Sequence, residues 1–464
     1  MWRSSMHDEI HSAQVQIGTT ISRARAGEDR ELSQQVRQTG EKFARIFYGL
    51  LHMTRIHTID NVAFNQPVQE FHRVLDHLCK LLGAVHIICV EDQVYVNDVR
   101  IRFEAASDHV EGLGAELHRH GVGGISFNDI ITKKQVMILI ELIMGGAAQK
   151  ASRIVLQRKL NEKGMSSVEL QGIFRFRIKG ESVRSMDREF REVYQQSAEV
   201  IAEAYRNLSA NRLPNPLPVR RLVNELIDIS RSSSIADMAW DHDKRLPHYS
   251  RHTLMVTNLS LLIGLAAGFS DATLGDLGVA AMFHDAGRSL KEDGYWVPHH
   301  RHATAGLRSL MRQRGFHEAK VRRLLAVVEH HRPYDSSQGR PSLFARIIHI
   351  ADDYDILTRF RPGKGPVMVQ PDALARMAAN SGTSYDPDLF QVFVNNMGIF
   401  PPGSILRLES GRIVVSVSGA RSKKTFATPL CRLVRNADGS QAQKQELVDL
   451  AAEDHVVKIL RPST

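Results

Sequence analysis

The apolar positions in the first part of the chain recur at helical spacing and then switch to strand spacing. Between Glu41 and Leu82 they return every three or four residues, which predicts two amphipathic helices with a break near Asn65-Gln66-Pro67. From Ala84 to Phe103 the apolar runs are β-like and short acidic or amide pairs separate them, which predicts an antiparallel meander. Further predicted elements are helices at 110–119, 133–144 and 187–208, and strands at 125–127 and 168–178.

A proline-rich stretch separates these elements from a second, helical pattern. Residues 211–218 read NRLPNPLP, and their three prolines remove backbone donors and favour extended structure. We therefore place the main domain boundary there. The predicted fold class is multidomain α+β, an N-terminal α/β module followed by an all-α domain and a small C-terminal β-hairpin region. The expected parts are a polar lead-in (1–40), a regulatory or dimerisation module (41–210), the linker (211–218), the helical domain (219–403), and the hairpin with its tail (404–464).

Composition and charge narrow the class of protein. A chain of 464 residues is too long for one ordinary core. No apolar run approaches the roughly 20 residues that span a bilayer, so no membrane insertion is expected. The three cysteines, Cys79, Cys89 and Cys431, are scattered, which argues against a disulfide framework and favours a cytoplasmic location. The net charge of +9 suits an anionic ligand, but no dense basic block is interleaved with aromatic residues, so no nucleic-acid partner is expected.

The 22 histidines are the compositional feature that indicates metal chemistry. An apolar run over 274–283 leads directly into the pair His284-Asp285, and Gly287 follows two residues later. Adjacent helical side chains diverge by about 100°, so an imidazole and a carboxylate from such a pair can meet one metal from neighbouring directions. The second carboxylate oxygen stays available for a second metal. Taken alone, the pair fits a buried hydrogen-bonded couple better than a metal site.

Other ligand-type residues follow the linker in a fixed order. His248 and His252 are four residues apart, which puts both on one helix face. More than four imidazole and carboxylate ligands without thiolates suit iron, manganese or zinc, and favour two metals that share a bridging carboxylate. Such a site would polarise a phosphate and generate a hydroxide from a bridging water. The full set is His248, His252, His284, Asp285, His302, His330, His331, Asp335 and Asp352, whereas His299, His300, His317 and His349 are expected at the surface.

The order His, His-Asp, His, His-His, Asp resembles that of the HD superfamily of metal-dependent phosphohydrolases. The most similar branch is HD-GYP, bacterial phosphodiesterases of cyclic di-GMP. The segment FHDAG at 283–287 matches the HD-x-G signature, and IADDYDILT at 350–358, followed by Arg361-Pro362, is similar to the late signature of the branch. Residues 402–415 are similar to its closing β-hairpin. The resemblance covers about residues 245–415.

This resemblance implies an all-helical catalytic core with two or three divalent metals, iron or manganese. The implied reaction is attack of a metal-bridging hydroxide on cyclic di-GMP or a related cyclic dinucleotide in bacterial signalling. Asp285 would bridge the metals, and Arg288 with Arg361 or Lys364 would neutralise the phosphate. The implied metal ligands are His252, His284, Asp285, His302, His330, His331 and Asp352, with His248 as an additional ligand where some members use a glutamate.

The chain also departs from the branch's HHExxDGxGYP motif. Residues 330–341 read HHRPYDSSQGRP, so Arg332 stands in place of the glutamate, and GYP is reduced to Gly339-Arg340-Pro341 after a one-residue insertion. Arg288 replaces the lysine of HDxGK, which keeps the charge but not the geometry. Two alternatives to the phosphodiesterase therefore stay open, a catalytically degenerate HD signalling or nucleotide-binding module and a nucleotidase or alarmone hydrolase of the superfamily. The helix at 187–208 would either mediate a homodimer or pack within the chain.

Overall fold

The computed structural model describes residues 28–90, 93–97, 99–101, 109–148, 152–173, 186–232, 248–292, 294–313, 318–359, 368–420, 425–442, 446–450 and 455–460. The chain forms two compact units. The first comprises residues 1–182, 207–218 and 308–321, and the second comprises residues 183–206, 219–307 and 322–464.

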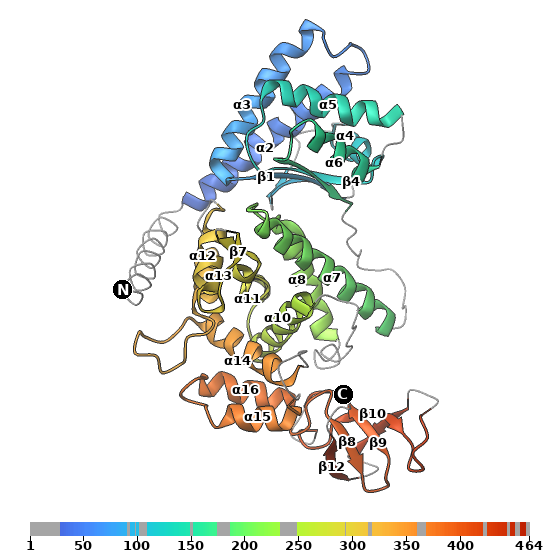
Figure 1. Cartoon of the computed structure of the whole chain (residues 1–464), viewed down its shortest axis with the longest axis vertical. Coiled ribbons are helices and arrows are strands. Elements are labelled where there is room, and N and C mark those ends of the chain that lie inside the picture. Colours follow the sequence, from blue (N-terminus) through green and yellow to red (C-terminus); the bar gives the residue numbers. More distant parts are fainter. Residues whose placement is uncertain are drawn as a thin grey trace. The chain divides into compact units, whose positions relative to one another are not determined.

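The first unit is an antiparallel sheet with a helical layer on one face (Figure 1). The predicted helices and meander are confirmed, and α2 begins at Glu28, inside the expected lead-in, with Val36 already in the core. Helix α6 was not predicted, because only two of its side chains, Leu156 and Leu160, are buried in an otherwise basic segment. The strand order is β3-β2-β1-β4-β5. The elements are α2 (Glu28–Met53), α3 (Asn65–Leu82), β1 (Val85–Val90), β2 (Gln93–Val96), β3 (Val99–Ile101), α4 (His109–His118), β4 (Val122–Phe127), α5 (Lys133–Ala148), α6 (Arg153–Glu162) and β5 (Val168–Gly172).

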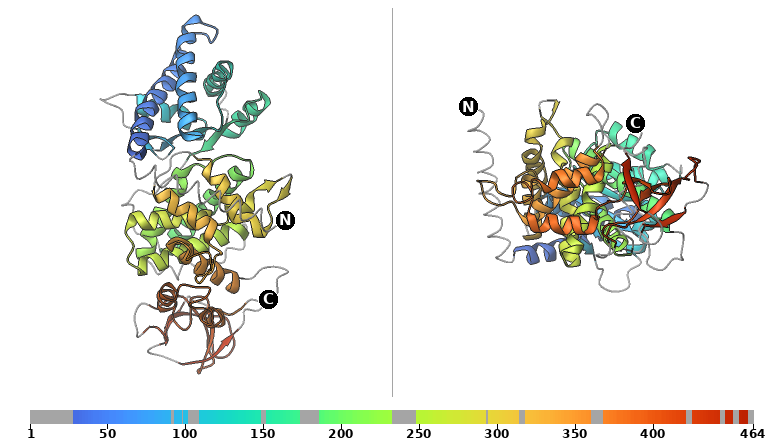
Figure 2. Two further views of the ribbon diagram at one scale, coloured as in Figure 1. Left: turned by 90° about the vertical axis from the view of Figure 1, so that its left-hand side faces the viewer. Right: turned by 90° about the horizontal axis from the view of Figure 1, so that it is seen from below.

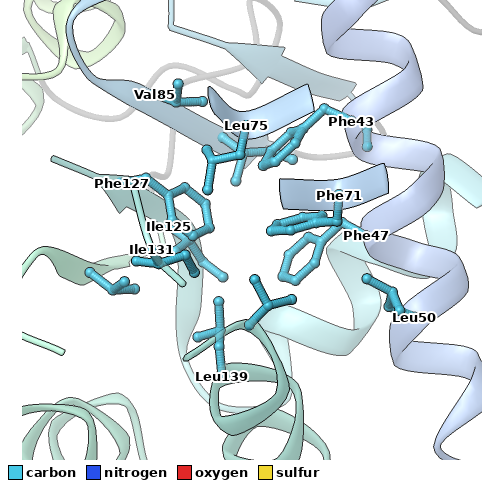
Figure 3. Close-up of a cluster of buried hydrophobic side chains, with 14 of the residues drawn as sticks. Phe43, Phe47, Leu50, Phe71, Leu75, Val85, Ile125, Phe127, Ile131 and Leu139 are labelled. Carbon is cyan, nitrogen blue, oxygen red and sulfur yellow. The ribbon is translucent and has the colours of Figure 1, made fainter. Parts of the chain in front are cut away.

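Phenylalanines at helical spacing fill the core of this unit (Figure 3). Phe43 and Phe47 lie one helical turn apart on α2, and both pack on Phe71 of α3. The ring of Phe43 lies 4.9 Å from that of Phe71 and 5.9 Å, edge-on, from that of Phe127 in β4. All four side chains are fully buried. Burying a side chain of this size stabilises the fold by about 1.5–3 kcal/mol, so these contacts hold α2 and α3 on the sheet.

The other face of the sheet is covered by the proline-rich stretch. Ile88 and Val90 point away from the helical layer, because side chains alternate along a strand, and they pack against Leu217. Asn215 donates through Nδ2 to Gln171 Oε1 at 2.9 Å. Residues 213–215 are buried. The segment expected as an extended linker is therefore ordered against the sheet.

The second unit is built around two apolar helices, α10 and α14. Val256, Leu259 and Ile263 of α10 meet Ile347 and Ile348 of α14 in one buried cluster. A helix that is apolar over most of its circumference is expected inside a domain rather than at its surface. Helices of this unit are α7 (Met186–Ser209), α8 (Pro216–Ser232), α10 (His248–Ala266), α11 (Asp271–Phe283), α12 (His302–Met311), α13 (Glu318–Glu329), α14 (Leu343–Thr358), α15 (Gln370–Ala378) and α16 (Pro387–Met397), with 3-10 turns η2 (Ala286–Ser289) and η3 (His299–Arg301).

Helix α7 packs within the chain. Its Tyr205 donates through the hydroxyl to the carbonyl of Met282 at 3.1 Å, and its ring stacks on that of Tyr249 at 5.9 Å. These contacts favour the intrachain alternative for the helix predicted at 187–208. In the described part of the chain, no helix is long and apolar enough to cross a membrane.

The chain ends in a five-stranded antiparallel sheet of order β11-β10-β9-β8-β12. The predicted hairpin is confirmed, with Leu406 of β8 opposite Val414 of β9. It is extended on both sides, however, where a hairpin with a tail was expected. Alternating buried residues such as Leu433 and Val448 supply the common face. The strands are β8 (Ile405–Leu408), β9 (Ile413–Ser416), β10 (Leu430–Arg435), β11 (Leu447–Asp449) and β12 (Val456–Leu460), so the mixed α+β class is confirmed.

Candidate metal centre

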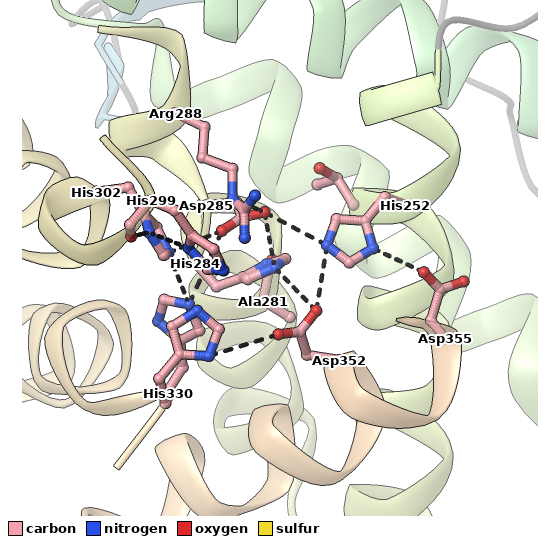
Figure 4. A network of polar contacts seen from close by, with 12 residues as sticks. His252, Ala281, His284, Asp285, Arg288, His299, His302, His330, Asp352 and Asp355 are labelled. Carbon is pink, nitrogen blue, oxygen red and sulfur yellow. Dashed lines mark hydrogen bonds and ion pairs between the residues drawn. The ribbon is translucent and has the colours of Figure 1, made fainter. Parts of the chain in front are cut away.

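The helices of the second unit bring seven of the predicted ligand residues together (Figure 4). Most of these residues lie at helix ends, where the chain turns and a side chain can point into the centre: His284 caps α11, His302 begins α12, and His330 and His331 follow α13 directly. His252 and Asp352 project from the packed helices α10 and α14. Two clusters result, one of Asp285, His302, His330 and His331 and one of His252, His284 and Asp352.

The carboxylate of Asp285 lies between the two clusters. Its Oδ1 is 3.1 Å from His302 Nε2 and 3.8 Å from His330 Nε2. Its Oδ2 is 3.4 Å from His252 Nε2 and 3.7 Å from His284 Nε2. One carboxylate therefore faces both clusters, one oxygen to each, which is the geometry that a bridging ligand needs.

Asp352 makes a second connection between the clusters. Its Oδ1 lies 3.2 Å from His252 Nε2, and its Oδ2 lies 3.8 Å from His331 Nδ1. The His331 side chain is 35% exposed, whereas the other six residues of the two clusters are buried. The centre is therefore accessible to solvent at His331.

Backbone carbonyls fix the orientation of three imidazoles. Nδ1 of His284 donates to the carbonyl of Ala281 at 2.6 Å, and Nδ1 of His330 donates to that of Val327 at 2.8 Å. His302 makes the same contact with the carbonyl of His299, again three residues earlier. A neutral imidazole has a single N–H, so each of these rings turns the lone pair of Nε2 into the centre.

Several acceptor atoms of the centre have no hydrogen-bond donor. In the described part of the chain, His284 Nε2, Asp285 Oδ1 and both carboxylate oxygens of Asp352 are buried without a hydrogen-bond partner. Nε2 of His302 and Nε2 of His330 are 3.2 Å apart. Each unsatisfied buried acceptor destabilises the fold by about 1–3 kcal/mol. A cation would satisfy all of them, and nitrogen and oxygen donors without thiolates fit a divalent transition metal.

The charge states of these residues also suit a cation. Burial lowers the pKa of His284 and of His330, and it lowers the pKa of His331 to about 4. For Asp285 and Asp352 burial raises the pKa, but the neighbouring histidines outweigh it, so both pKa values lie below the usual range. At neutral pH, His284, His330 and His331 are therefore neutral, and Asp285 and Asp352 are ionised, which are the forms that coordinate metals.

Asp355 is a functional candidate to which the sequence pattern gave no role. Its Oδ2 lies 2.7 Å from His252 Nδ1 and 2.5 Å from a guanidinium nitrogen of Arg359. Burial lowers the pKa of His252, but the neighbouring carboxylates of Asp285, Asp352 and Asp355 raise it well above its usual value. The available signal was the i,i+3 spacing of Asp352 and Asp355, which puts both carboxylates on one face of α14.

Replacing Asp355 with asparagine is expected to weaken metal binding by about 10- to 100-fold while the fold is retained, because carboxylates that orient a ligating histidine contribute that much to affinity. The matched control is Asp353→Asn. Asp353, two residues earlier on α14, pairs with Tyr385 and His349 rather than with the centre. Manganese titration by calorimetry measures both, and equal affinities in the two variants would remove Asp355 from the support of His252.

Gly287 allows the close contact that sets His302 in the centre. A Cβ on Gly287 would lie 1.8 Å from the carbonyl oxygen of His302 and 2.8 Å from the backbone nitrogen of Gly306. The backbone of η2 thus packs directly on the first turn of α12. The glycine of the HD-x-G signature has this physical reason here.

The remaining predicted site residues that the structure describes belong to neither cluster. Arg288 approaches Asp285, with Nε 2.7 Å from Oδ2, and its side chain is 36% exposed. Asp335 belongs to neither cluster; it is exposed, and its backbone N–H donates to the carbonyl of Thr383. His248 is the first residue of α10, but its side chain, like Arg361 and Lys364, lies outside the described residues.

Of two histidines expected at the surface, one is buried and the other is exposed. The prediction is wrong for His349, which is 9% exposed and lies 3.3 Å from Asp353 Oδ2 through Nε2. His299 is exposed as predicted, yet its ring lies 5.2 Å from that of His302 and 5.6 Å from that of His331. His299 therefore lies at the edge of the centre.

Arg332, which stands in place of the motif's glutamate, has a structural contact. Its NH1 donates to Glu329 Oε1 at 2.9 Å, and Glu329 Oε2 accepts from the backbone N–H of Ser342 at 2.8 Å. These bonds connect the end of α13 to the start of α14. The altered motif thus still holds together two helices that deliver His330 and Asp352.

The chain is similar to several known proteins. Residues 249–357 match the HD domain family. A cyclic di-GMP phosphodiesterase of Pseudomonas aeruginosa is 28% identical over 229 residues, which cover 45% of this chain, so the chain spans about half (53%) of that relative's length. An HDG"Y"P protein from Bdellovibrio bacteriovorus superposes with a TM-score of 0.36 at 11% identity, covering 68% of this chain and 94% of that structure. The family match shows that residues 249–357 form an HD domain, as the order of the histidines and aspartates predicted.

Proposed function

We propose that this chain is a metal-dependent phosphohydrolase that cleaves cyclic di-GMP or a related cyclic dinucleotide in bacterial signalling. The observation that carries the proposal is the Asp285 carboxylate, which faces one group of imidazoles with each oxygen. A relative that is a cyclic di-GMP phosphodiesterase supports the substrate. The HD domain supports the broader class of metal-dependent hydrolysis.

The two clusters would each hold one divalent cation, iron or manganese. His302, His330 and His331 would bind one, His252 and His284 the other, and Asp285 and Asp352 would be shared. Bound there, the cations would polarise a phosphodiester and lower the pKa of water. His248 stays a proposed additional ligand.

The residues around the clusters have separate tasks in this proposal. Burial of the imidazoles keeps bulk water out and strengthens each electrostatic contact. The exposed side of the centre, at His331, is where a phosphate would enter. Arg288 would share its charge between Asp285 and the phosphate, as a planar donor that can bind two oxygens. Arg361 and Lys364 stay proposed phosphate contacts.

The main alternative is a catalytically silent module that binds nucleotide or metal and transmits a signal. The changed motif favours it, because Arg332 is engaged with Glu329, and Gly339 and Arg340 of the Gly339-Arg340-Pro341 remnant are solvent-exposed. A nucleotidase or alarmone hydrolase is the second alternative.

A substrate panel on metal-reconstituted protein tests the three functions. The protein is loaded with manganese or iron under reducing conditions and given cyclic di-GMP, guanosine tetraphosphate and nucleoside monophosphates, with products separated by chromatography. We expect cyclic di-GMP to be consumed fastest and a metal chelator to stop the reaction. Faster hydrolysis of a monophosphate or the tetraphosphate would reassign the substrate. Metal-loaded protein that hydrolyses none of them would support the silent module.

A further inference from the structure

A small hairpin with two exposed aromatic rings interrupts the segment that carries the metal-centre residues. Strands β6 (Lys291–Glu292) and β7 (Tyr295–Trp296) form it, and it projects from the surrounding helices (Figure 2). Tyr295 is 80% exposed and Trp296 is 60% exposed. Exposed aromatic side chains of this size are candidates for a contact surface.

The hairpin is anchored at the edge of the metal centre on both sides. At its base, the backbone N–H of Val297 donates to the carbonyl of Leu290 at 3.1 Å, and Val297 is buried. Arg288, which contacts Asp285, lies three residues before β6. His299, whose ring lies against His302, lies three residues after Trp296. An extended residue spans at most about 3.6 Å, so Trp296 is within about 11 Å of His299 along the backbone, inside the reach of a nucleotide.

The two faces of the hairpin have opposite chemistry. Lys291 is paired with Trp296, and Glu292 is paired with Tyr295, so each pair lies on its own face. The Lys291 ammonium lies 4.7 Å above the Trp296 ring. On the other face, Glu292 Oε2 lies 3.1 Å from a guanidinium nitrogen of Arg301. One face thus offers a cation beside an aromatic surface, whereas the other presents a carboxylate already paired.

We propose that Trp296 and Lys291 bind the purine base and the adjoining phosphate of the nucleotide whose reacting phosphate lies at the metal centre. The indole offers a stacking surface for a base, and the ammonium complements an anionic phosphate. The Tyr295 face is less suited to this ligand, because the Arg301 guanidinium beside it is already paired with the Glu292 carboxylate. This inference rests on the proposed function for the position of the phosphate, and it makes a purine nucleotide the ligand class.

The test uses Trp296 as its own reporter. The chain has three tryptophans, and Trp2 and Trp240 lie outside the described residues. In the full chain carrying Trp2→Phe and Trp240→Phe, Trp296 is the sole indole. Its fluorescence is recorded during titration with GMP, with a hydrolysis-resistant phosphorothioate analogue of cyclic di-GMP, and with inorganic phosphate. We expect both guanine nucleotides to quench the indole and phosphate alone to leave it unchanged.

Equilibrium binding to variants then separates the two faces. Trp296→Ala is expected to weaken analogue binding by about 5- to 150-fold, the fold-change that corresponds to loss of one base–aromatic stack, whereas Trp296→Phe keeps most of it. Lys291→Ala is expected to weaken the analogue as well. Tyr295→Ala is the matched control on the opposite face and should bind as the unaltered chain does.

The further outcomes distinguish failure of the base-binding inference from failure of the proposed phosphodiesterase function. Equal analogue affinity in Trp296→Ala and Tyr295→Ala, or no nucleotide binding by the unaltered chain, would overturn the inference. Cyclic di-GMP turnover with an unchanged KM in Trp296→Ala would overturn the inference but keep the phosphodiesterase. Base-dependent quenching without any metal-dependent turnover would keep the inference and remove the phosphodiesterase.

Discussion

Replacing Asp285 with asparagine is expected to lower turnover at least about a thousandfold, because loss of metal-derived charge stabilisation is worth several kcal/mol and each 1.36 kcal/mol is tenfold in rate. The change keeps the shape of the side chain but removes its charge. Asp285 Oδ1 faces His302 and Oδ2 faces His252, so one substitution affects both clusters. An amide nitrogen cannot replace a ligating oxygen, and metal content should fall together with activity.

The matched control is Asp276→Asn, on the helix that leads to Asp285. Asp276 lies 3.7 Å from Arg323 and 3.6 Å from Arg322 and belongs to neither cluster. Its substitution should leave metal content and turnover unchanged. Metal analysis by mass spectrometry and the chromatographic assay are run on the same samples. Asp285→Asn protein with full metal content and undiminished turnover would show that this carboxylate does not join the clusters.

The second large effect is expected for Gly287→Ala. The added methyl group would meet the carbonyl oxygen of His302 at 1.8 Å, and backbone cannot move aside as a flexible side chain can. We expect the free energy of unfolding to fall by about 3 kcal/mol, at the upper end for overpacking, and metal binding to weaken because His302 is displaced.

Gly275→Ala provides the contrast within the same region. Gly275 lies in α11, and a Cβ there would meet no atom closer than Asn224 Oδ1 at 3.9 Å. Because alanine is a better helix former by about 1 kcal/mol, this variant should be as stable as the unaltered chain or more so. Urea unfolding followed by circular dichroism measures both. A Gly287→Ala variant as stable and metal-loaded as Gly275→Ala would refute the close packing of η2 on α12.

Local sequence patterns predicted most of the elements, and the resemblance to the HD superfamily indicated which histidines and aspartates belong to the clusters. Phe43 and Phe47 in α2, and Phe71 in α3, belong to apolar positions that recur at helical spacing within each helix. That spacing alone indicated the face on which α2 and α3 are buried. The cluster histidines were recognisable because several of them follow or begin helices, at points where an apolar run ends. Such features depend on residues that lie within about one helical turn of one another in the sequence.

Features that depend on distant partners were not predictable in this way. The role of Asp355 depends on a ring 103 residues earlier in the chain, at His252. The proline-rich stretch became ordered because the open face of the first sheet offers Gln171 and Ile88 as partners. Strand β12 pairs with β8, from which it is about 50 residues distant in the sequence. The local turn near Gly411 therefore indicated the hairpin of β8 and β9 but not the rest of the sheet.

The most direct test of the account is the number and spacing of bound metal ions. Protein prepared without metal is titrated with manganese, and its electron paramagnetic resonance spectrum is recorded at each step. Because Asp285 faces both clusters, the account predicts two ions per chain and a multiline spectrum of two exchange-coupled ions at saturation. One ion per chain with the six-line spectrum of isolated manganese, or no bound ion, would contradict a centre built on a shared Asp285.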